Sequence, residues 1–158
     1  MHSTIFQISR ERIDKQDYIK ESKYYENSIG RITDYAAIRP GEREAEIEYL
    51  RRNLEGIAEF DGDSFCISNK KEYFLEKYSC FKKGLRNLSA VTIDDFISAC
   101  GGQTSSGIWK LRQAYEDQYG AYVDDNYGEH GLITFDEFMR TVDNGDKLYI
   151  GAVLDYHI

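Results

Sequence analysis

The sequence predicts an α+β fold: a small antiparallel or mixed sheet, made of the terminal strands plus a central hairpin, with helices packed on one face. Three observations lead to this prediction. Strand patterns lie near both ends, at 5–8 and 148–156, a hairpin pattern lies at 57–67, and helix patterns fill the intervening stretches. At 158 residues the chain fits a single domain, 1–158.

The first third of the chain contains one short strand and two helical patterns. Residues 5–8 are mostly apolar and favour a strand, and the polar and aromatic stretch 14–25 indicates one or two short helical turns. Residues 27–40 give no clear pattern. A helix is expected at 42–55, because one stripe of a helix would hold three apolar side chains, Ile47, Leu50 and Leu54.

The segment 57–67 has the strongest hairpin signal in the chain. Two apolar strands flank Asp61 and Gly62, a dipeptide that tolerates the positive φ angles of a type I′ turn. The pairing places four side chains on one face: Ala58, Phe60, Phe65 and Ile67.

Three helices are expected in the middle of the sequence, each with its apolar side chains turned inward. Asn69 and Glu72 resemble a capping box that opens the first helix. Its expected core stripe is Phe74, Tyr78, Phe81, Leu85 and Leu88. The second helix begins at Thr92 and carries Ile93, Phe96, Ile97 and Cys100. The third covers about 106–119, with Ile108, Leu111, Tyr115 and Tyr119 inward.

The last part of the chain predicts a short helix and a closing strand. Thr134 and Glu137 form a capping box before a helix at 135–141. A turn at Asn144 and Gly145 precedes the strand 148–156, which is expected to pair with the strand at 5–8.

Charge is unevenly distributed along the chain, whose net charge is −8. Residues 69–86 carry six basic and two acidic side chains, whereas residues 113–146 carry nine acidic side chains and one basic one. A net acidic chain is poorly suited to bind a nucleic-acid backbone directly, because that binding needs a basic surface.

Cysteine usage and hydropathy favour a cytoplasmic protein. The three cysteines have no CxxC spacing and lie among apolar neighbours, which predicts free core thiols at Cys66, Cys80 and Cys100 in a reducing compartment. The start of the sequence lacks the pattern of a signal peptide, and no apolar run is long enough to cross a membrane.

No motif in the sequence predicts a metal, a cofactor or a catalytic group. The segment 126–138 resembles an EF-hand loop, but Asn126, Gly128 and His130 stand where Ca²⁺ needs several anionic oxygens. Cys80 is the best candidate nucleophile, since it lies in a basic helix, but it is expected in the core. The sequence therefore predicts no cofactor, no metal site and no catalytic residue.

The leading functional hypothesis is a non-enzymatic acidic domain that binds a basic protein partner. Carboxylates can imitate the phosphate row of DNA, and tyrosines are favoured at interfaces. In size, charge and aromatic content, but in no motif, the chain resembles small acidic inhibitors of restriction and CRISPR nucleases. The expected partner-binding residues are Glu116, Asp117, Tyr119, Tyr122, Asp124, Asp125, Tyr127, Glu129, Asp136, Asp143 and Asp146.

The sequence leaves two alternatives open. One is a small enzyme whose groups are too scattered to be seen in one sequence. The other is a structural or oligomer-forming domain, in which the strand 148–156 lies at an exposed sheet edge and pairs between chains. The sequence does not decide the oligomeric state.

Overall fold

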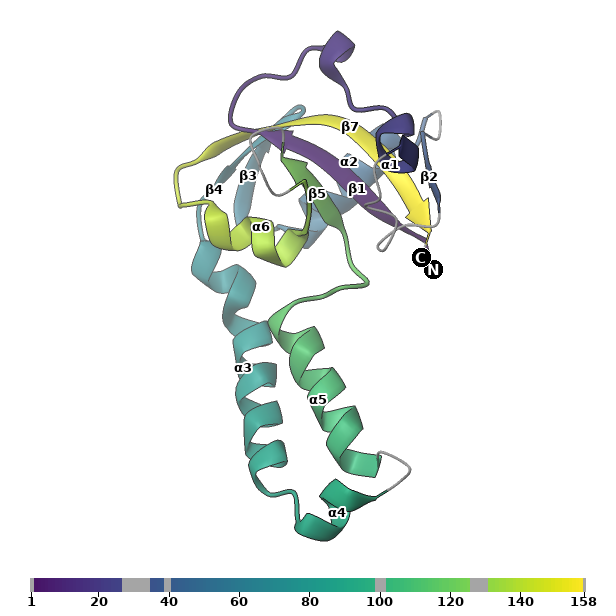
Figure 1. Ribbon diagram of the computed structural model, residues 1–158. Coiled ribbons are helices and arrows are strands. Elements are labelled where there is room, and N and C mark those ends of the chain that lie inside the picture. Colours follow the sequence, from purple (N-terminus) through teal and green to yellow (C-terminus); the bar gives the residue numbers. More distant parts are fainter. Residues whose placement is uncertain (1, 27–34, 39–40, 99–101, 126–130, 158) are drawn as a thin grey trace. The chain divides into compact units, whose positions relative to one another are not determined.

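The computed structural model describes residues 2–26, 35–38, 41–98, 102–125 and 131–157. It divides into two compact units. The sheet unit comprises residues 1–70 and 119–158, and the helical unit comprises residues 71–118. The elements are β1 (His2–Ser9), η1 (Lys15–Asp17), α1 (Ser22–Glu26), β2 (Tyr35–Ala37), α2 (Arg43–Asn53), β3 (Ala58–Asp61), β4 (Ser64–Ile67), α3 (Lys70–Ser89), α4 (Ile93–Ile97), α5 (Gly102–Tyr115), β5 (Tyr122–Asp125), β6 (Leu132–Thr134), α6 (Phe135–Thr141) and β7 (Lys147–His157) (Figure 1).

A mixed seven-stranded sheet forms the framework of the sheet unit. Its order is β3-β4-β7-β1-β5-β6, and β2 also pairs with β7. β1 pairs with β5 in parallel, while every other described pairing is antiparallel. The predicted α+β class and the pairing of the N-terminal strand with the C-terminal one are confirmed. β7 lies inside the sheet, between β4 and β1 (Figure 1).

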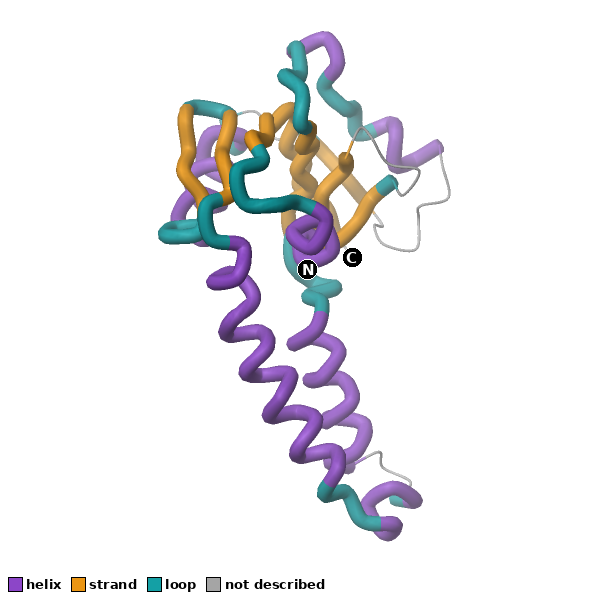
Figure 2. The backbone as a smooth tube through the Cα atoms, turned by 90° about the vertical axis from the view of Figure 1, so that its left-hand side faces the viewer, coloured by secondary structure: helices purple, strands orange, loops and turns teal. Residues whose placement is uncertain are grey.

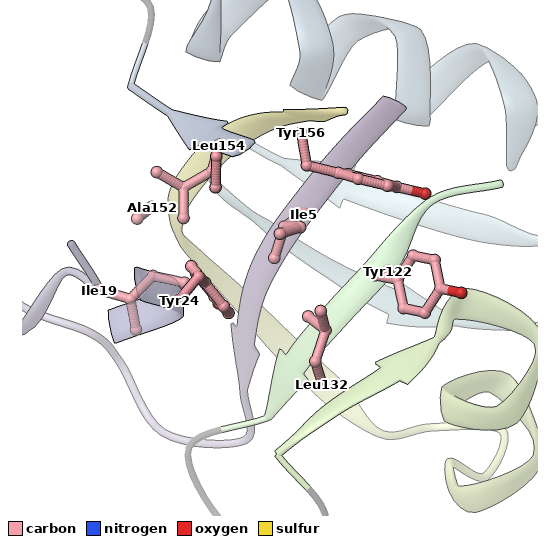
Figure 3. Close-up of a cluster of buried hydrophobic side chains, with 9 residues drawn as sticks. Ile5, Ile19, Tyr24, Tyr122, Leu132, Ala152, Leu154 and Tyr156 are labelled. Atoms are coloured by element: carbon pink, nitrogen blue, oxygen red, sulfur yellow. The ribbon is translucent and has the colours of Figure 1, made fainter. Parts of the chain in front are cut away.

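One face of the sheet packs on the segment that contains η1 and α1. Because side chains alternate along a strand, Ile5 of β1 and Leu154 of β7 point to the same side. Tyr122 and Tyr156 meet there edge to face, with ring centroids 5.5 Å apart. Figure 3 shows this core, whose members are Ile5, Ile19, Tyr24, Ala36, Tyr122, Leu132, Ala152, Leu154 and Tyr156.

The helix α2 packs on the sheet through the predicted apolar stripe. Ile47 and Leu50 are buried, as is Leu54 just after the helix end. At the polar edge of this contact, the Thr4 hydroxyl donates to Glu46 Oε2 over 2.8 Å. The helix predicted at 42–55 is therefore confirmed, together with the side that it buries.

The hairpin predicted at 57–67 is confirmed, but its turn differs from the prediction. Asp61 pairs with Ser64, so the two-residue loop consists of Gly62 and Asp63. Of these two loop residues, only Gly62 has a positive φ, at 58°. A type I′ turn needs positive φ at both loop residues, whereas a type II′ turn needs it only at the first. The turn is therefore of the II′ kind.

A bulge interrupts the pairing of β1 with β7, and side chains satisfy its backbone groups. The register shifts between Phe6 and Ile8, so that Gln7 faces both Gly151 and Ala152. The Ala152 N–H donates to Gln7 Oε1 over 3.0 Å. On the other side, Arg43 Nε donates to the Gly151 carbonyl over 2.8 Å. The bulge is thus held by two polar side chains from distant parts of the chain.

The helical unit is an antiparallel hairpin of α3 and α5, with the short α4 between them (Figure 2). The α3 segment contains no proline and no β-branched residue, which favours a long helix. α4 begins at a complete capping box of Thr92 and Asp95, as the sequence predicts. α5 begins at Gly102 and ends at Tyr115, four residues earlier at each end than expected. None of the helices that the structure describes could span a membrane.

Candidate interaction surface

The two long helices of the helical unit contact each other through glycine and apolar side chains. Gly84 lies against Leu111 and Gly107 lies against Leu88, so closely that a methyl group on Gly107 would be 2.8 Å from Leu88 Cδ2. Phe81 packs against Tyr115, with ring centroids 6.1 Å apart. The two glycine–leucine contacts define the inner side of the hairpin, and Phe81 on that side reaches the more exposed Tyr115 at its margin.

A second row of apolar side chains on each helix is only partly covered within the helical unit. We call Tyr78, Leu85, Ile108 and Tyr115 the hairpin stripe; each is between 41% and 59% exposed. On both helices the two members are seven residues apart, which is close to two helical turns. Each pair is therefore one above the other on its helix, about 10 Å apart.

Both halves of the hairpin stripe lie on the same side of the hairpin. Leu85 directly follows the inward-facing Gly84, and Ile108 directly follows the inward-facing Gly107. Each successive residue of a helix is rotated by 100° about the helix axis. Seen along one direction, two antiparallel helices rotate in opposite senses, clockwise in one and anticlockwise in the other. The residues that directly follow the inward-facing ones therefore project from the same side of the hairpin on both helices.

The same side carries two cations between the apolar pairs. Lys82 follows the inward Phe81, and Arg112 follows the inward Leu111. From 77 to 89 and from 102 to 115 the sequence contains six basic residues and no acidic one. The opposite side, one position before the inner contacts, is polar apart from one thiol: Cys80, Lys83, Asn87, Ser106 and Lys110.

The short helix α4 adds a more exposed apolar group at the end of the hairpin. Ile93, Phe96 and Ile97 are spaced as neighbours on one helical stripe, and they are 67–70% exposed. We call these three residues the tip stripe. The capping box at Thr92 fixes the start of α4, and Thr104 Oγ1 of α5 donates to the Asp95 carbonyl over 3.3 Å.

These exposures correct the prediction that the middle helices turn their apolar residues into a core. α3 and α4 contain no buried residue at all. Seven residues expected inward are exposed in the hairpin and tip stripes, and Tyr119 and the Cys80 thiol are exposed too. Full burial of one such large side chain contributes about 1.5–3 kcal/mol of favourable free energy. Covering a half-exposed stripe with a partner would therefore still be favourable. Aligned exposed patches of this kind mark interaction sites.

The acidic stretch 113–146 does not form the continuous outward surface that the sequence predicts. Tyr122 is buried in the sheet, and Asp124 and Asp136 are only 1% and 2% exposed. Tyr122 and Asp124 belong to β5, which is buried on both of its faces, and Asp136 lies in the largely buried first turn of α6. Tyr122, Asp124 and Asp136 therefore cannot belong to an outward surface in this structure.

The other residues of the predicted acidic surface are divided between the units. Glu116 and Asp117 belong to the helical unit, whereas Tyr119, Asp125, Asp143 and Asp146 belong to the sheet unit. Asp143 is highly exposed, but Asp146 pairs with Arg10 over 3.1 Å. The Asp143 N–H and Arg10 lower the pKa of Asp146. Tyr127 and Glu129 lie outside the described residues, so their predicted binding role stays a prediction, as does that of the exposed members.

Asp124 is the centre of a buried polar cluster that the sequence does not reveal. Lys23 Nζ donates to both of its carboxylate oxygens, over 2.8 and 2.6 Å, and the Tyr24 hydroxyl donates to Oδ2 over 2.8 Å. Burial and the adjacent carboxylate raise the pKa of Tyr24 well above its ordinary value of 10. The phenol is therefore neutral at physiological pH and unsuited to act as a base. The cluster joins α1 to β5.

A polar groove of about 450 Å³ in the sheet unit has no catalytic signature. It contains charges of both signs, and its Asp63 is paired with Arg43 over 3.0 Å. Its lining has neither histidine nor cysteine and consists of Arg12, Ile13, Asp14, Lys15, Tyr18, Asp61, Asp63, Ser64, Lys147, Tyr149 and Ile150. The hydroxyl of Ser64 in this lining donates to the Asp61 carbonyl over 2.9 Å.

Among the described residues, no three His, Cys, Asp or Glu side chains are close enough to hold a metal ion. Most of the EF-hand-like loop, 126–130, lies outside the described residues. At its end, the Glu137 N–H donates to Thr134 Oγ1 over 3.1 Å, so the Thr134 half of the predicted capping box of α6 is confirmed.

Comparisons with protein-family models, with curated proteins and with solved structures found no significant match to this chain.

Proposed function

We propose that this protein acts by binding another protein, and that the helical hairpin is its binding element. The observation that carries this proposal is the alignment of seven large apolar side chains, exposed on the hairpin stripe and the tip stripe. Scattered exposed apolar residues are ordinary on protein surfaces, but aligned rows on adjacent helices are not.

The composition of the two stripes supports a protein as the ligand. Tyrosine and phenylalanine are enriched at protein interfaces, and they supply large contact areas at low entropic cost. Leucine and isoleucine add an aliphatic surface that suits another helix better than a small polar molecule. Charge also separates the units: the helical unit has seven basic and six acidic side chains, net +1, and the remainder has 13 and 22, net −9.

That charge separation also supports a second candidate function, in the sheet unit. A net charge of −9 favours a basic partner through long-range attraction, and an inhibitor that occupies the nucleic-acid site of a nuclease is one such case. The exposed Asp143 is the described residue that best represents this surface. Such binding weakens as salt rises, because exposed charges are screened beyond about 10 Å at 0.1 M.

One capture experiment tests both functions. The full chain is immobilised and exposed to host extract at low and high salt, as wild type, as the stripe variant Leu85→Gln with Ile108→Gln, and as the control Lys83→Gln with Lys110→Gln. Glutamine maintains helix propensity, so both variants should keep the helical circular dichroism of the wild type. The control changes the opposite side of the same two helices.

We expect the stripe variant to lose at least about 90% of one specific captured protein, because two central apolar contacts are removed. The control should retain that protein. Equal capture by both variants would refute the hairpin as the binding element. Basic proteins that both variants capture, and that high salt releases, would instead support the acidic sheet unit.

A further inference from the structure

We infer that the hairpin stripe binds an acidic amphipathic helix of a partner protein. This inference rests on the proposed function and adds the chemistry of the partner to it. Two features of the helical unit carry it: the geometry of the apolar pairs and the sign of the charges between them.

The geometry matches a third helix lying along the hairpin. Tyr78 and Leu85 on α3 are seven residues apart, as are Ile108 and Tyr115 on α5. Gly84 lies beside Leu111, and Leu88 lies beside Gly107. With this pairing of the two helices, Leu85 and Ile108 are at nearly the same height along the hairpin. Tyr78 and Tyr115 are likewise at nearly the same height. The side therefore has two apolar levels about 10 Å apart. A helix with apolar residues at i, i+3, i+4 and i+7 spans that distance and contacts both levels.

The charges select an acidic helix. Lys82 and Arg112 emerge on the stripe side between the two apolar levels, and the surrounding stretches 77–89 and 102–115 hold only basic charges. A partner helix packed on the stripe would place its flanking residues next to these cations. Glutamate there gains an opposite charge, while lysine meets a like charge.

The same charges disfavour two other occupants. A second copy of the hairpin would bring its own Lys82 and Arg112 toward the same two cations. A nucleic acid would gain from the cations and from the Tyr78 and Tyr115 rings, but the aliphatic level of Leu85 and Ile108 offers its bases no stacking surface, and the whole chain is net negative at −8. An acidic helix is the occupant that satisfies both the apolar levels and the cations.

The test measures binding of three labelled probes to the full chain by fluorescence anisotropy. The first is a designed helical peptide of about 18 residues, long enough for five turns, with leucine at the apolar positions and glutamate at the flanking ones. The second has lysine in place of every glutamate, and the third is a single-stranded oligonucleotide. We expect the glutamate peptide to bind about tenfold more tightly than the lysine peptide at low salt, as two exposed ion pairs would give.

Variants of the chain identify which side of the hairpin binds the peptides. Lys82→Glu with Arg112→Glu should reverse the preference between the two peptides, whereas Lys83→Glu with Lys110→Glu, on the opposite side, should leave its direction unchanged. Leu85→Gln with Ile108→Gln should weaken both peptides at least about tenfold, through the loss of apolar contact. Because the preference of the wild-type chain is itself measured, the test stays decisive even if a variant fails to fold.

Other outcomes overturn the inference. Equal binding of the two peptides, tighter binding of the oligonucleotide, or a dimer in sedimentation that the Leu85 and Ile108 changes dissociate would each refute an acidic helix as the occupant. Host-protein capture that depends on the stripe, together with no peptide preference, would reject only this inference. Capture that is independent of the stripe would reject the proposed function.

Discussion

At the scale of single residues, Gln7 shows how much one buried polar side chain organises. Its Nε2 donates to the Asp17 carbonyl, and its Oε1 accepts from the Ile19 and Ala152 N–H groups. It is fully buried, and it connects η1 and the following loop to the bulge of β7. Without it, three backbone groups would lose their partners, at about 1–3 kcal/mol for each one left buried.

Gly151 is required because its neighbour Gln7 occupies the space of a side chain. A Cβ at position 151 would lie 2.5 Å from Gln7 Oε1 and 3.0 Å from Ile13 Cδ1. We expect Gly151→Ala to lower the free energy of unfolding by about 1–3 kcal/mol, measured by urea denaturation, because Gln7 must move from its hydrogen bonds. In a Gln7→Ala background most of this cost should disappear. An unchanged cost there would show that Gln7 is not the cause.

Tyr24 makes the stability of the sheet unit sensitive to high pH. Its pKa is raised in the folded state, by burial first and by Asp124 second, so the folded phenol keeps its proton when the unfolded one releases it near pH 10. The contribution is fully present below that pH and declines above it. The wild-type advantage over Tyr24→Phe should therefore shrink by about 1.4 kcal/mol per pH unit above 10. Parallel stability curves for the two proteins from pH 8 to 11 would contradict this.

Sequence reasoning could not find Gln7 or Asp124 as buried centres, and the reason is physical. Their partners lie far along the chain: Ala152 is 145 residues from Gln7, and Lys23 is 101 residues from Asp124. A polar residue in a strand is ordinarily assigned to the solvent side, and only the tertiary partners reverse that assignment. The prediction of an acidic surface failed at Asp124 for this reason.

At the scale of elements, local patterns predicted what forms but not always what it contacts. The α2 helix, the β3–β4 hairpin and the α6 cap depend on side chains within a few residues, and all three are confirmed. The stripe of α3 has the periodicity of a buried face as well. Periodicity identifies an apolar side of a helix, but it does not say whether this chain or another covers it. The periodicity of α3 therefore did not reveal that Tyr78 and Leu85 are exposed.

The turn of the β3–β4 hairpin gives a prediction that separates the two turn types. Gly62 has φ of 58°, while Asp63 keeps a negative φ, as a type II′ turn requires. We expect Gly62→Ala to lower the free energy of unfolding by about 1–2 kcal/mol, the cost of a left-handed conformation with a Cβ. Asp63→Gly should also lower it, because a flexible residue is placed where no positive φ is needed. Stabilisation by Asp63→Gly would instead indicate the type I′ turn.

At the scale of the whole molecule, the sequence predicted the α+β class because its signals lie at both ends of the chain. The terminal strands β1 and β7 pair antiparallel from His2–His157 to Ser9–Tyr149, as expected. The sequence did not reveal β2 or β6, which are only three residues long, nor the inner position of β7. Short strands carry too few side chains for an alternation to be recognised.

The inner position of β7 has a consequence for synthesis of the protein. β7 joins β1 to β4 and also pairs with β2, so β1 and β4 each lack one of their two neighbours, and β2 lacks its described partner, until residues 147–157 have left the ribosome. Until then the nascent chain displays unpaired edges and an uncovered apolar face, which are the features that chaperones recognise and that promote aggregation. The helical hairpin comprises residues 71–118, which are all synthesised before β7. It can therefore form before the sheet is complete.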